Sequence, residues 1–266
     1  EHLREHLVIF TDRQPPSDAH GSFVAGGLKL DVREVLPGRI IPLVLPKGRL
    51  DQQNVSILMD LDEERWRELV DLTHDAGAFD DVLTDYQRIL RQRQGSGDLI
   101  CEGAYRNVKQ VLNALHDERS SLLTDAVSAL REGKLVVLDL SLFRARAQAL
   151  LGIVLSRVFE HNMRVSTDAN GQTIPVIAVI EEAQNVLDGK ETEVTRPFIE
   201  FTKEGRKFYC GIMGITQQPG SIDTEIISQS DNFFAFHLLS EGDLHTLRKA
   251  NPHFSDDILS SLLNEP

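Results

Sequence analysis

A short apolar run that ends in two adjacent acids constrains the fold of this chain most. Residues 176–180, with the sequence VIAVI, follow a proline and lead directly into Glu181 and Glu182. A run so short and so apolar predicts a central strand that is buried on both faces of a parallel sheet. Because the ligand crevice of an open α/β sheet lies beyond the carboxyl ends of its strands, we expect both acids to lie at a binding site.

Two adjacent carboxylates at such a site repel each other unless a cation or a reacting water uses them. This is the Walker B arrangement of nucleotide hydrolases, in which the first acid serves the magnesium shell and the second polarises the attacking water. Glu181 would take the first role and Glu182 the second. The simpler alternative is an ordinary strand end with two solvated glutamates.

The composition is that of a packed globular protein. The chain has 266 residues, of which 41% are apolar, and no apolar run approaches the roughly 20 residues of a membrane span. The opening residues Glu1–His6 do not resemble a signal peptide, so we expect a cytoplasmic protein with no membrane partner. Cys101 and Cys210 have no second cysteine at CxxC spacing, and we expect both to be small buried apolar residues.

The net charge of -13 argues against a surface that coats nucleic acid, because Lys and Arg supply the nonspecific affinity for DNA. It does not argue against a ring-shaped motor, which can confine its basic residues to the pore. The histidines show no metal-binding spacing such as HExxH, and no GxSxG motif occurs. The sequence therefore indicates neither a histidine metal site nor a serine nucleophile.

Changes in the character of the sequence divide the chain into three parts. Residues 1–53 contain a predicted strand at 7–10 and a predicted edge strand at 28–32, residues 54–131 indicate a helical insertion, and residues 132–266 alternate between strands and helices. The remaining expected elements are helices at 62–70, at 79–90 and from 107 in the insertion, then strands at 134–140, 176–180, 209–215 and 233–239 and helices at 144–163 and 196–205. This order predicts right-handed crossovers and an α/β fold, with a mostly parallel sheet flanked by helices.

An amide follows the next predicted strand after the two acids. Gln217 comes two residues after the run that ends at Ile215. A glutamine at a strand end can donate a hydrogen bond to a γ-phosphate or to the attacking water, and it would let the site sense its nucleotide. The alternative is a strand end capped by a turn, with Pro219 and Gly220 supplying the turn geometry.

Two further polar positions are weaker candidates. Arg206 lies on a charged glycine turn, where its guanidinium would reach a neighbouring subunit's nucleotide as an arginine finger, or would simply be solvated. Asp139 ends the predicted strand at 134–140 and is a candidate third acid. A helix-capping role for Asp139 or Ser141 is the favoured interpretation.

One expected motif does not occur. The 266 residues contain no GxxxxGK[ST], the loop that cradles the β- and γ-phosphates in nucleotide hydrolases. Either the protein is not a nucleotide hydrolase, or the segment with that loop lies upstream of Glu1.

Taken in order, three segments carry a resemblance to a known family. Residues 177–185 (IAVIEEAQN), 201–208 (FTKEGRKF) and 214–223 (GITQQPGSID) resemble the C-terminal half of a HerA-type ATPase. That family belongs to the HerA and FtsK group of hexameric DNA-pumping motors. The similarity covers roughly residues 134–266.

The resemblance implies a RecA-like core of the P-loop ASCE type that uses ATP and Mg2+. It places Glu181 on the metal side, Glu182 at the water-activating position and Gln217 at the sensor position. Arg206 becomes a candidate arginine finger in trans and Lys207 a secondary cation. Glu181 departs from the more usual aspartate, and Gln184 stands where histidine is common.

The resemblance also implies partners and a longer chain. The family acts on double-stranded DNA as a homo-hexamer, often with a nuclease in DNA end processing, and related chains work with an effector in antiphage systems. Its phosphate loop precedes a strand like that at 7–10, with an aspartate near the position of Asp12. The chain then looks truncated, and we expect these 266 residues alone to bind ATP weakly or not at all.

Two alternatives remain open at this point. A conjugation or type IV secretion ATPase shares the same core and would move DNA or protein through a membrane complex. A non-catalytic assembly module would instead use the helical block at 54–131 to dock a partner. The sequence that precedes Glu1 would distinguish an enzyme from such a module.

Overall fold

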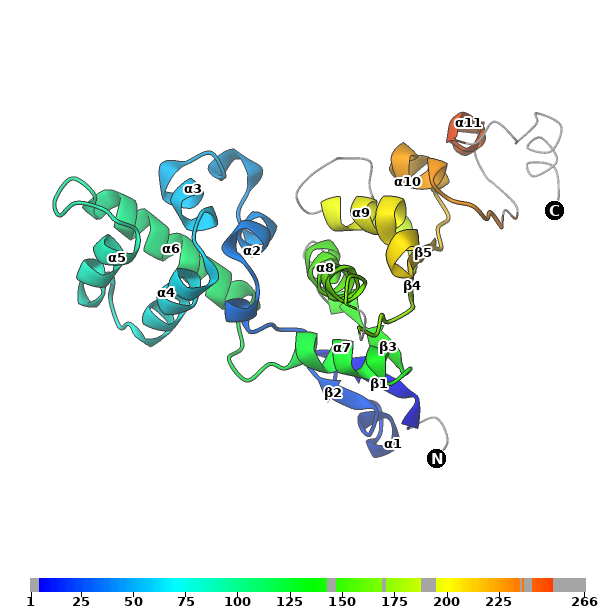
Figure 1. Ribbon diagram of the computed structural model, residues 1–266, viewed down its shortest axis with the longest axis horizontal. Helices are drawn as coiled ribbons and strands as arrows, with labels where there is room; N and C mark the ends of the chain where they lie inside the picture. Colours follow the sequence, from blue (N-terminus) through cyan, green and yellow to red (C-terminus); the bar gives the residue numbers. More distant parts are fainter. Residues whose placement is uncertain are drawn as a thin grey trace. The chain divides into compact units, whose positions relative to one another are not determined.

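The computed structural model describes residues 5–142, 147–168, 171–187, 195–234, 236 and 241–250. The chain divides into two units, 1–146 and 147–266. Each unit contains parallel strands flanked by helices (Figure 1), so the predicted α/β class is confirmed. Among the described residues, no helix combines the length and the apolar character needed to cross a membrane.

The first unit is built on a parallel sheet with the strand order β2-β1-β3. Its strands are β1 (Leu7–Phe10), β2 (Val24–Gly26) and β3 (Leu135–Leu138). The central strand β1 pairs with β3 in continuous register, from Leu7 opposite Leu135 to Phe10 opposite Leu138. Because β1 and β3 are neighbours in space, most of the helices of this unit are inserted between two adjacent strands.

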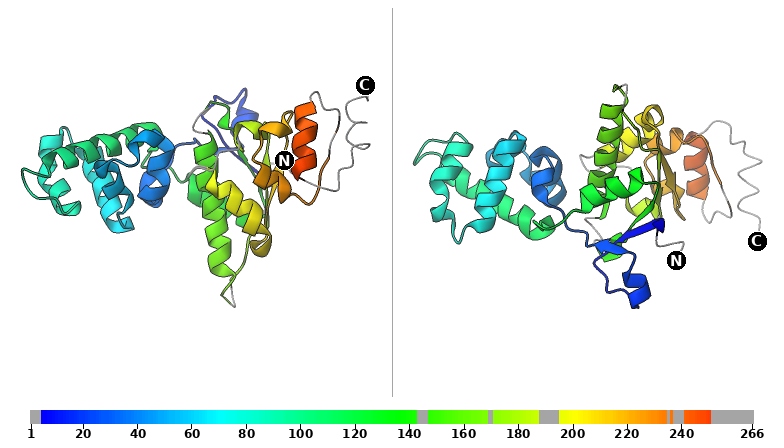
Figure 2. Two further views of the ribbon diagram at one scale, coloured as in Figure 1. Left: turned by 90° about the horizontal axis from the view of Figure 1, so that it is seen from above. Right: turned by 60° about the horizontal axis from the view of Figure 1, so that its bottom comes forward.

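Helices make up the rest of the first unit. They are α1 (Asp18–Gly21), α2 (Pro37–Val44), α3 (Gln53–Met59), α4 (Glu63–Asp75), α5 (Leu83–Ile89), α6 (Asp98–Leu115) and α7 (Leu122–Arg131). Short 3-10 turns are η2 (Val32–Glu34), η3 (Lys47–Arg49), η4 (Phe79–Asp81) and η5 (Leu140–Leu142). Helices α2 to α6 form a group that is separate from the strands, whereas α7 packs on β3 (Figure 2).

The group of helices α2 to α6 has its own apolar core. Apolar side chains recur three and four positions apart along these helices and bury one face of each. Trp66 and Tyr86 are fully buried, and the Trp66 indole N–H donates a hydrogen bond of 2.9 Å to the carbonyl of Val32. Burying an aromatic side chain with its polar atom satisfied stabilises such a core strongly.

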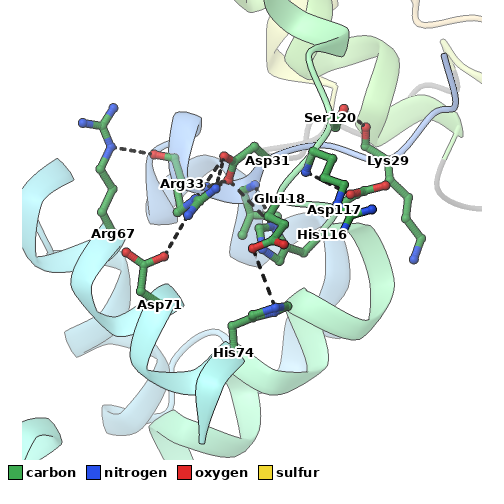
Figure 3. Close-up of polar contacts among 12 residues, drawn as sticks. Lys29, Asp31, Arg33, Arg67, Asp71, His74, His116, Asp117, Glu118 and Ser120 are labelled. Atoms are coloured by element: carbon green, nitrogen blue, oxygen red, sulfur yellow. Dashed lines mark hydrogen bonds and ion pairs between the residues drawn. The ribbon is translucent and has the colours of Figure 1, made fainter.

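A polar cluster joins the start of this helical group to its end (Figure 3). Arg33 forms ion pairs of 2.7 Å with Asp31 and 3.0 Å with Asp71, which lies on α4. His116, just after α6, is buried, and its Nδ1 accepts a hydrogen bond of 3.3 Å from the backbone N–H of Val32. The cluster therefore connects η2, α4 and the end of α6.

The second unit is built on two parallel strands, β4 (Val176–Ile180) and β5 (Cys210–Gly214). Its helices are α8 (Ala147–Val165), α9 (Arg196–Glu204), α10 (Thr224–Ser228) and α11 (Glu241–Ala250), with 3-10 turns η7 (Ala183–Asn185), η8 (Gly205–Phe208) and η9 (Pro219–Ser221). The fully buried Asn162 of α8 donates hydrogen bonds of 2.7 Å and 2.8 Å to the carbonyls of Ile174 and Phe208. A single side-chain amide thus holds the residues before both strands against α8.

Several expected elements are confirmed, although their limits differ. Strands form at 7–10, 135–138, 176–180 and 210–214, and helices at 147–165 and 196–204 match the expected positions. Helix α6 begins at Asp98, nine residues before the expected start at Asn107. Cys101 and Cys210 are free and buried, as expected. The expected polar loop at 188–194 lies outside the described residues.

Two predictions about strands were wrong. Residues 28–32 form only an isolated bridge between Leu30 and His116, because the carboxylate of Asp31 accepts the N–H of Arg33 and starts the turn η2. The strand 176–180 is not buried on both faces in the described residues. Ile177 and Val179 are 72% and 57% exposed, and they lie on the same face because alternate side chains of a strand point the same way.

The expected last strand at 233–239 is not formed by its described residues. Residues 233, 234 and 236 are not in a strand, and Phe234 and Phe236 are more than four-fifths exposed. Positions 235 and 237–239 lie outside the described residues.

Candidate active site

The two strands of the second unit bring two predicted site segments to one edge. Strands β4 and β5 are parallel, with Ile180 opposite Gly214, so both carboxyl ends lie on the same side. The pairing continues past the strands, because the N–H of Ile215 donates to Ile180 and the N–H of Ala183 donates to Ile215, each over 2.9 Å. Residues 181–184 and 216–217 therefore leave the sheet next to each other.

Glu182 turns the chain away from the sheet. Its backbone lies in the left-handed region, with φ 50° and ψ 46°, which is uncommon for a residue other than glycine. Such a conformation costs roughly 1 kcal/mol or more and persists where the surrounding structure imposes it. Strand β4 ends at Ile180, directly before this turn, and the side chains of both acids are exposed.

A chain of two hydrogen bonds fixes the carboxylate of Glu182. The hydroxyl of Thr216 donates to Oε1 of Gln184 over 2.6 Å, and Nε2 of Gln184 donates to Oε2 of Glu182 over 2.6 Å. An amide is suited to this position because it accepts at one end and donates at the other. The Oε1 atom of Glu182 has no hydrogen-bond partner among the described residues, so this oxygen is available to a ligand or a water.

Glu181 and Gln217 are the other two predicted residues at this edge. Both side chains are exposed, and neither makes a hydrogen bond or an ion pair with the described part of the chain. The described residues contain no group of three or more His, Cys, Asp or Glu side chains placed to hold a metal ion. The role expected for Glu181 needs no such cluster, because a magnesium ion that binds a nucleotide keeps most of its water and takes only one or two protein carboxylates.

Arg206 and Lys207 are not brought to the same edge. Both lie on η8, which precedes β5, whereas Gln217 follows β5. The strand between them rises roughly 15 Å, so neither cation reaches the acids of its own chain. Both side chains are exposed, and Lys207 forms an ion pair of 3.3 Å with Glu204.

Asp139 acts as a cap, the favoured one of its two predicted roles. It follows β3 in the first unit, and its Oδ1 accepts the N–H of Ser141 at 3.3 Å and also the Ser141 hydroxyl. Hydrogen bonds from Ser141, a further one from Thr11 and the charge of Arg13 lower the pKa of Asp139 below its ordinary value. Asp12, after β1, accepts a backbone N–H and is also structural.

Sequence reasoning missed the connection from Thr216 through Gln184 to Glu182. The available signal was the position of the two polar residues, each close to the end of a neighbouring parallel strand. Spacing along the chain does not reveal that contact, since Gln184 and Thr216 are 32 residues apart. The register of β4 on β5 creates it.

The described residues thus define an α/β protein with parallel strands flanked by helices, an architecture compatible with a RecA-like fold. No family model matches the chain. Comparison with curated proteins finds a protein named DNA double-strand break repair helicase HerA from Saccharolobus solfataricus. It is 28% identical over 142 residues, which is 52% of this chain and 28% of that protein.

Two proteins of the same name are similar in the same way. The one from Sulfolobus acidocaldarius is 26% identical over 58% of this chain and 33% of its own length. The one from Sulfurisphaera tokodaii is 28% identical over 52% of this chain and 28% of its own length. The chain is related to the HerA-type ATPases. It matches no more than 33% of the length of these relatives.

Proposed function

We propose that the protein is an ATP-hydrolysing DNA translocase or helicase motor of the HerA type. The observation that carries the proposal is the position of Glu182. Its carboxylate is oriented by Gln184 and Thr216, at the same strand edge as Glu181 and Gln217. An oriented and exposed carboxylate next to a second one is what activation of a water beside a metal requires.

Each residue at this edge takes one role in the proposed mechanism. Glu181 would hold the water shell of Mg2+, and Oε1 of Glu182 would accept a proton from the water that attacks the γ-phosphorus as the bond to the leaving ADP breaks. Gln217 donates a hydrogen bond to the γ-phosphate or to the same water. ATP would supply the phosphoryl group that is transferred to water, and a Mg2+ ion held at Glu181 would neutralise part of the phosphate charge. The links to Gln184 and Thr216 hold the Glu182 carboxylate in one orientation, which lowers the entropic cost of the reaction.

Arg206 acts on a neighbouring subunit in this proposal. Its distance along β5 from the acids excludes a role in its own site, whereas its exposure leaves the guanidinium available to a second copy. An arginine supplied in trans stabilises charge on the transferring phosphoryl group. Lys207 adds a second positive charge beside it. This arrangement requires a second copy of the chain beside each site, and we propose a homo-hexameric ring.

The proposed substrate is double-stranded DNA, and the proposed setting is the cytoplasm. The similar proteins are named DNA double-strand break repair helicase HerA, and this name supports a role in DNA end processing. The nuclease partner that we propose rests on the sequence resemblance alone. Antiphage defence with another effector protein is the second proposed setting, and it rests on the sequence resemblance alone.

The test is Glu182→Gln in the full-length protein, because these 266 residues contain no GxxxxGK[ST] motif. We expect DNA-stimulated ATP hydrolysis to fall by roughly 100-fold or more, since a positioned general base contributes about that factor. Nucleotide binding, measured with a fluorescent ATP analogue, should persist. Glutamine keeps the size of the side chain and its hydrogen bond to Gln184 but cannot take the proton.

Glu200→Gln is the matched control. Glu200 lies on α9 of the same unit and forms an exposed ion pair of 2.9 Å with Arg196, an interaction of little energetic value. Its hydrolysis rate should equal that of the unmodified protein. Hydrolysis by Glu182→Gln at the rate of this control would refute the proposed role of the acid pair.

A further inference from the structure

Helix α6 exposes a basic face in a molecule that is acidic as a whole. Residues 103–115 contain no Asp or Glu. Four exposed polar side chains in this stretch lie three, four and seven positions apart and therefore share one face of the helix: Arg106, Lys109, Gln110 and Asn113. With Ala114 they line an open hollow of about 360 Å³.

A third cation reaches this face from the turn η3. The Arg49 guanidinium donates a hydrogen bond of 2.7 Å to Oδ1 of Asn107 and one of 3.4 Å to Oε1 of Gln110. Asn107 is fully buried, and its Nδ2 has no partner among the described residues. Two neutral amides thus hold the guanidinium in place without cancelling its charge.

Four other arginines of the first unit are neutralised by carboxylates. The pairs are Arg33 with Asp31, Arg65 with Asp62, Arg67 with Glu63 and Arg88 with Glu68, at N–O distances of 2.5–2.7 Å. Arg49 and Lys109 have no carboxylate within ion-pair distance in the described part of the chain. Lys109 instead contacts the hydroxyl of Tyr105 at 3.2 Å. Arg106 pairs with Glu102, but this pair is exposed and gives way easily to a stronger anion.

We propose that this face, formed by Arg49, Arg106, Lys109, Gln110 and Asn113, binds the phosphate backbone of double-stranded DNA. Arginine, lysine and side-chain amides are the groups that contact phosphates in protein–DNA complexes. From Arg106 to Asn113 the helix rises about 10 Å, roughly three base steps along one strand. The choice of DNA, not an acidic protein, as the polyanion rests on the proposed function.

The test replaces Arg106 and Lys109 together by glutamine in the full-length protein. Binding to a fluorescent 30-base-pair duplex is measured by anisotropy without nucleotide, from 50 to 200 mM salt. Each lost phosphate contact removes about 0.9 from the slope of log affinity against log salt. The unmodified protein should therefore lose roughly tenfold more affinity across this salt range than the double variant does.

A second double variant serves as the matched control. Arg65→Gln with Arg88→Gln removes the same number of positive charges from the same unit, from a partly exposed side chain of α4 and an exposed one of α5. Its salt slope should stay that of the unmodified protein, and circular dichroism should show that both variants are folded. Equal slopes for both double variants and the unmodified protein would overturn the proposal. So would selective loss of binding to a poly-glutamate peptide with DNA binding intact, because that result indicates an acidic protein partner.

The outcome is separable from that of the proposed catalytic site. DNA binding here is measured without hydrolysis, whereas Glu182→Gln is tested by hydrolysis. Suppose that the Arg106 and Lys109 variant keeps the salt slope of the unmodified protein while Glu182→Gln loses hydrolysis. This result would refute DNA binding by the face of α6 and would support the proposed motor function.

Discussion

At the residue scale, the orientation of Glu182 is the feature on which the proposed chemistry depends. A glutamate at a strand end normally rotates freely in solvent. Here the left-handed backbone of Glu182 and the hydrogen bond from Gln184 restrict it. The hydrogen bond from Thr216 in turn restricts Gln184. The strain at Glu182 is the kind of local cost that functional sites retain.

His116 gives a prediction about pH at this scale. Burial is the main cause that lowers the pKa of His116 from its ordinary 6.5. The charge of Asp31 raises this pKa, whereas the charges of His74 and Arg33 lower it further. Because the folded pKa is depressed, the neutral imidazole stabilises the fold above pH 6.5, and this contribution is lost as pH falls below that value. Protonation also removes the acceptor used by the N–H of Val32.

The measurement is the free energy of unfolding in urea between pH 8 and pH 5. Stability of the unmodified chain should fall towards pH 5, and the fall should be smaller in His116→Gln, whose amide oxygen still accepts the N–H of Val32. His20→Gln, at an exposed histidine of α1, should keep the full pH dependence. If His116→Gln and His20→Gln show the same pH dependence, His116 does not control it.

At the element scale, the close packing of η8 on the start of β5 determines the position of Arg206. Gly205 begins η8 at a position where a Cβ atom would lie 2.5 Å from the carbonyl oxygen of Cys210. Its φ of -55° is open to any residue, so the requirement is for space and not for backbone freedom. Glycine at this position therefore permits the close packing of the turn on the strand that follows it.

Gly205→Ala should consequently destabilise the second unit. The added methyl group meets backbone, which cannot rotate away, and overpacking of this kind costs about 1–3 kcal/mol. Thermal unfolding and hydrogen exchange of the β5 amides measure the effect. Gly48→Ala is the control, because a Cβ at Gly48 meets no atom within 4 Å. Equal protection of β5 in both variants would contradict the packing argument.

The sequence predicted elements best where periodicity and turn residues agree. Helix α4 begins after Asp62, whose carboxylate accepts the N–H of Arg65 as acids before a helix are expected to do. The prediction of a strand at 28–32 was wrong because an alternation of apolar residues indicates which side chains are buried and not whether the backbone pairs with another strand. Leu28 and Leu30 are indeed fully buried, but Asp31 forms a local turn that competes with a strand.

At the scale of the whole molecule, the two units carry different parts of the proposal. The second unit holds the acids, the sensor amide and Arg206, whereas the first holds the basic face of α6. Placing Arg206 and Glu182 at opposite ends of β5 makes the proposed site complete only between two copies of the chain. Head-to-tail contacts of this type form a ring when the rotation between copies closes, and a closed ring is what we propose.

A mixing experiment with full-length protein tests that arrangement. Glu182→Gln and Arg206→Ala should each abolish hydrolysis alone. Rings assembled from equal amounts of the two variants should recover about a quarter of the unmodified activity, since about one interface in four then joins an intact Glu182 to an intact Arg206. Arg206→Ala mixed with Arg206→Ala is the control and should stay inactive. A mixture as inactive as its components would place Arg206 outside the neighbouring site.

The sequence by itself determined the strand 176–180, the two acids that follow it and the kinship with HerA-type ATPases, because apolar runs and adjacent charges are local properties of a chain. Only the tertiary structure decided that Gln184 and Thr216 orient Glu182, and that Arg206 lies away from the acids of its own chain. These relations depend on the register and direction of β4 and β5. Pairing between strands that are distant in sequence is not encoded in any one segment.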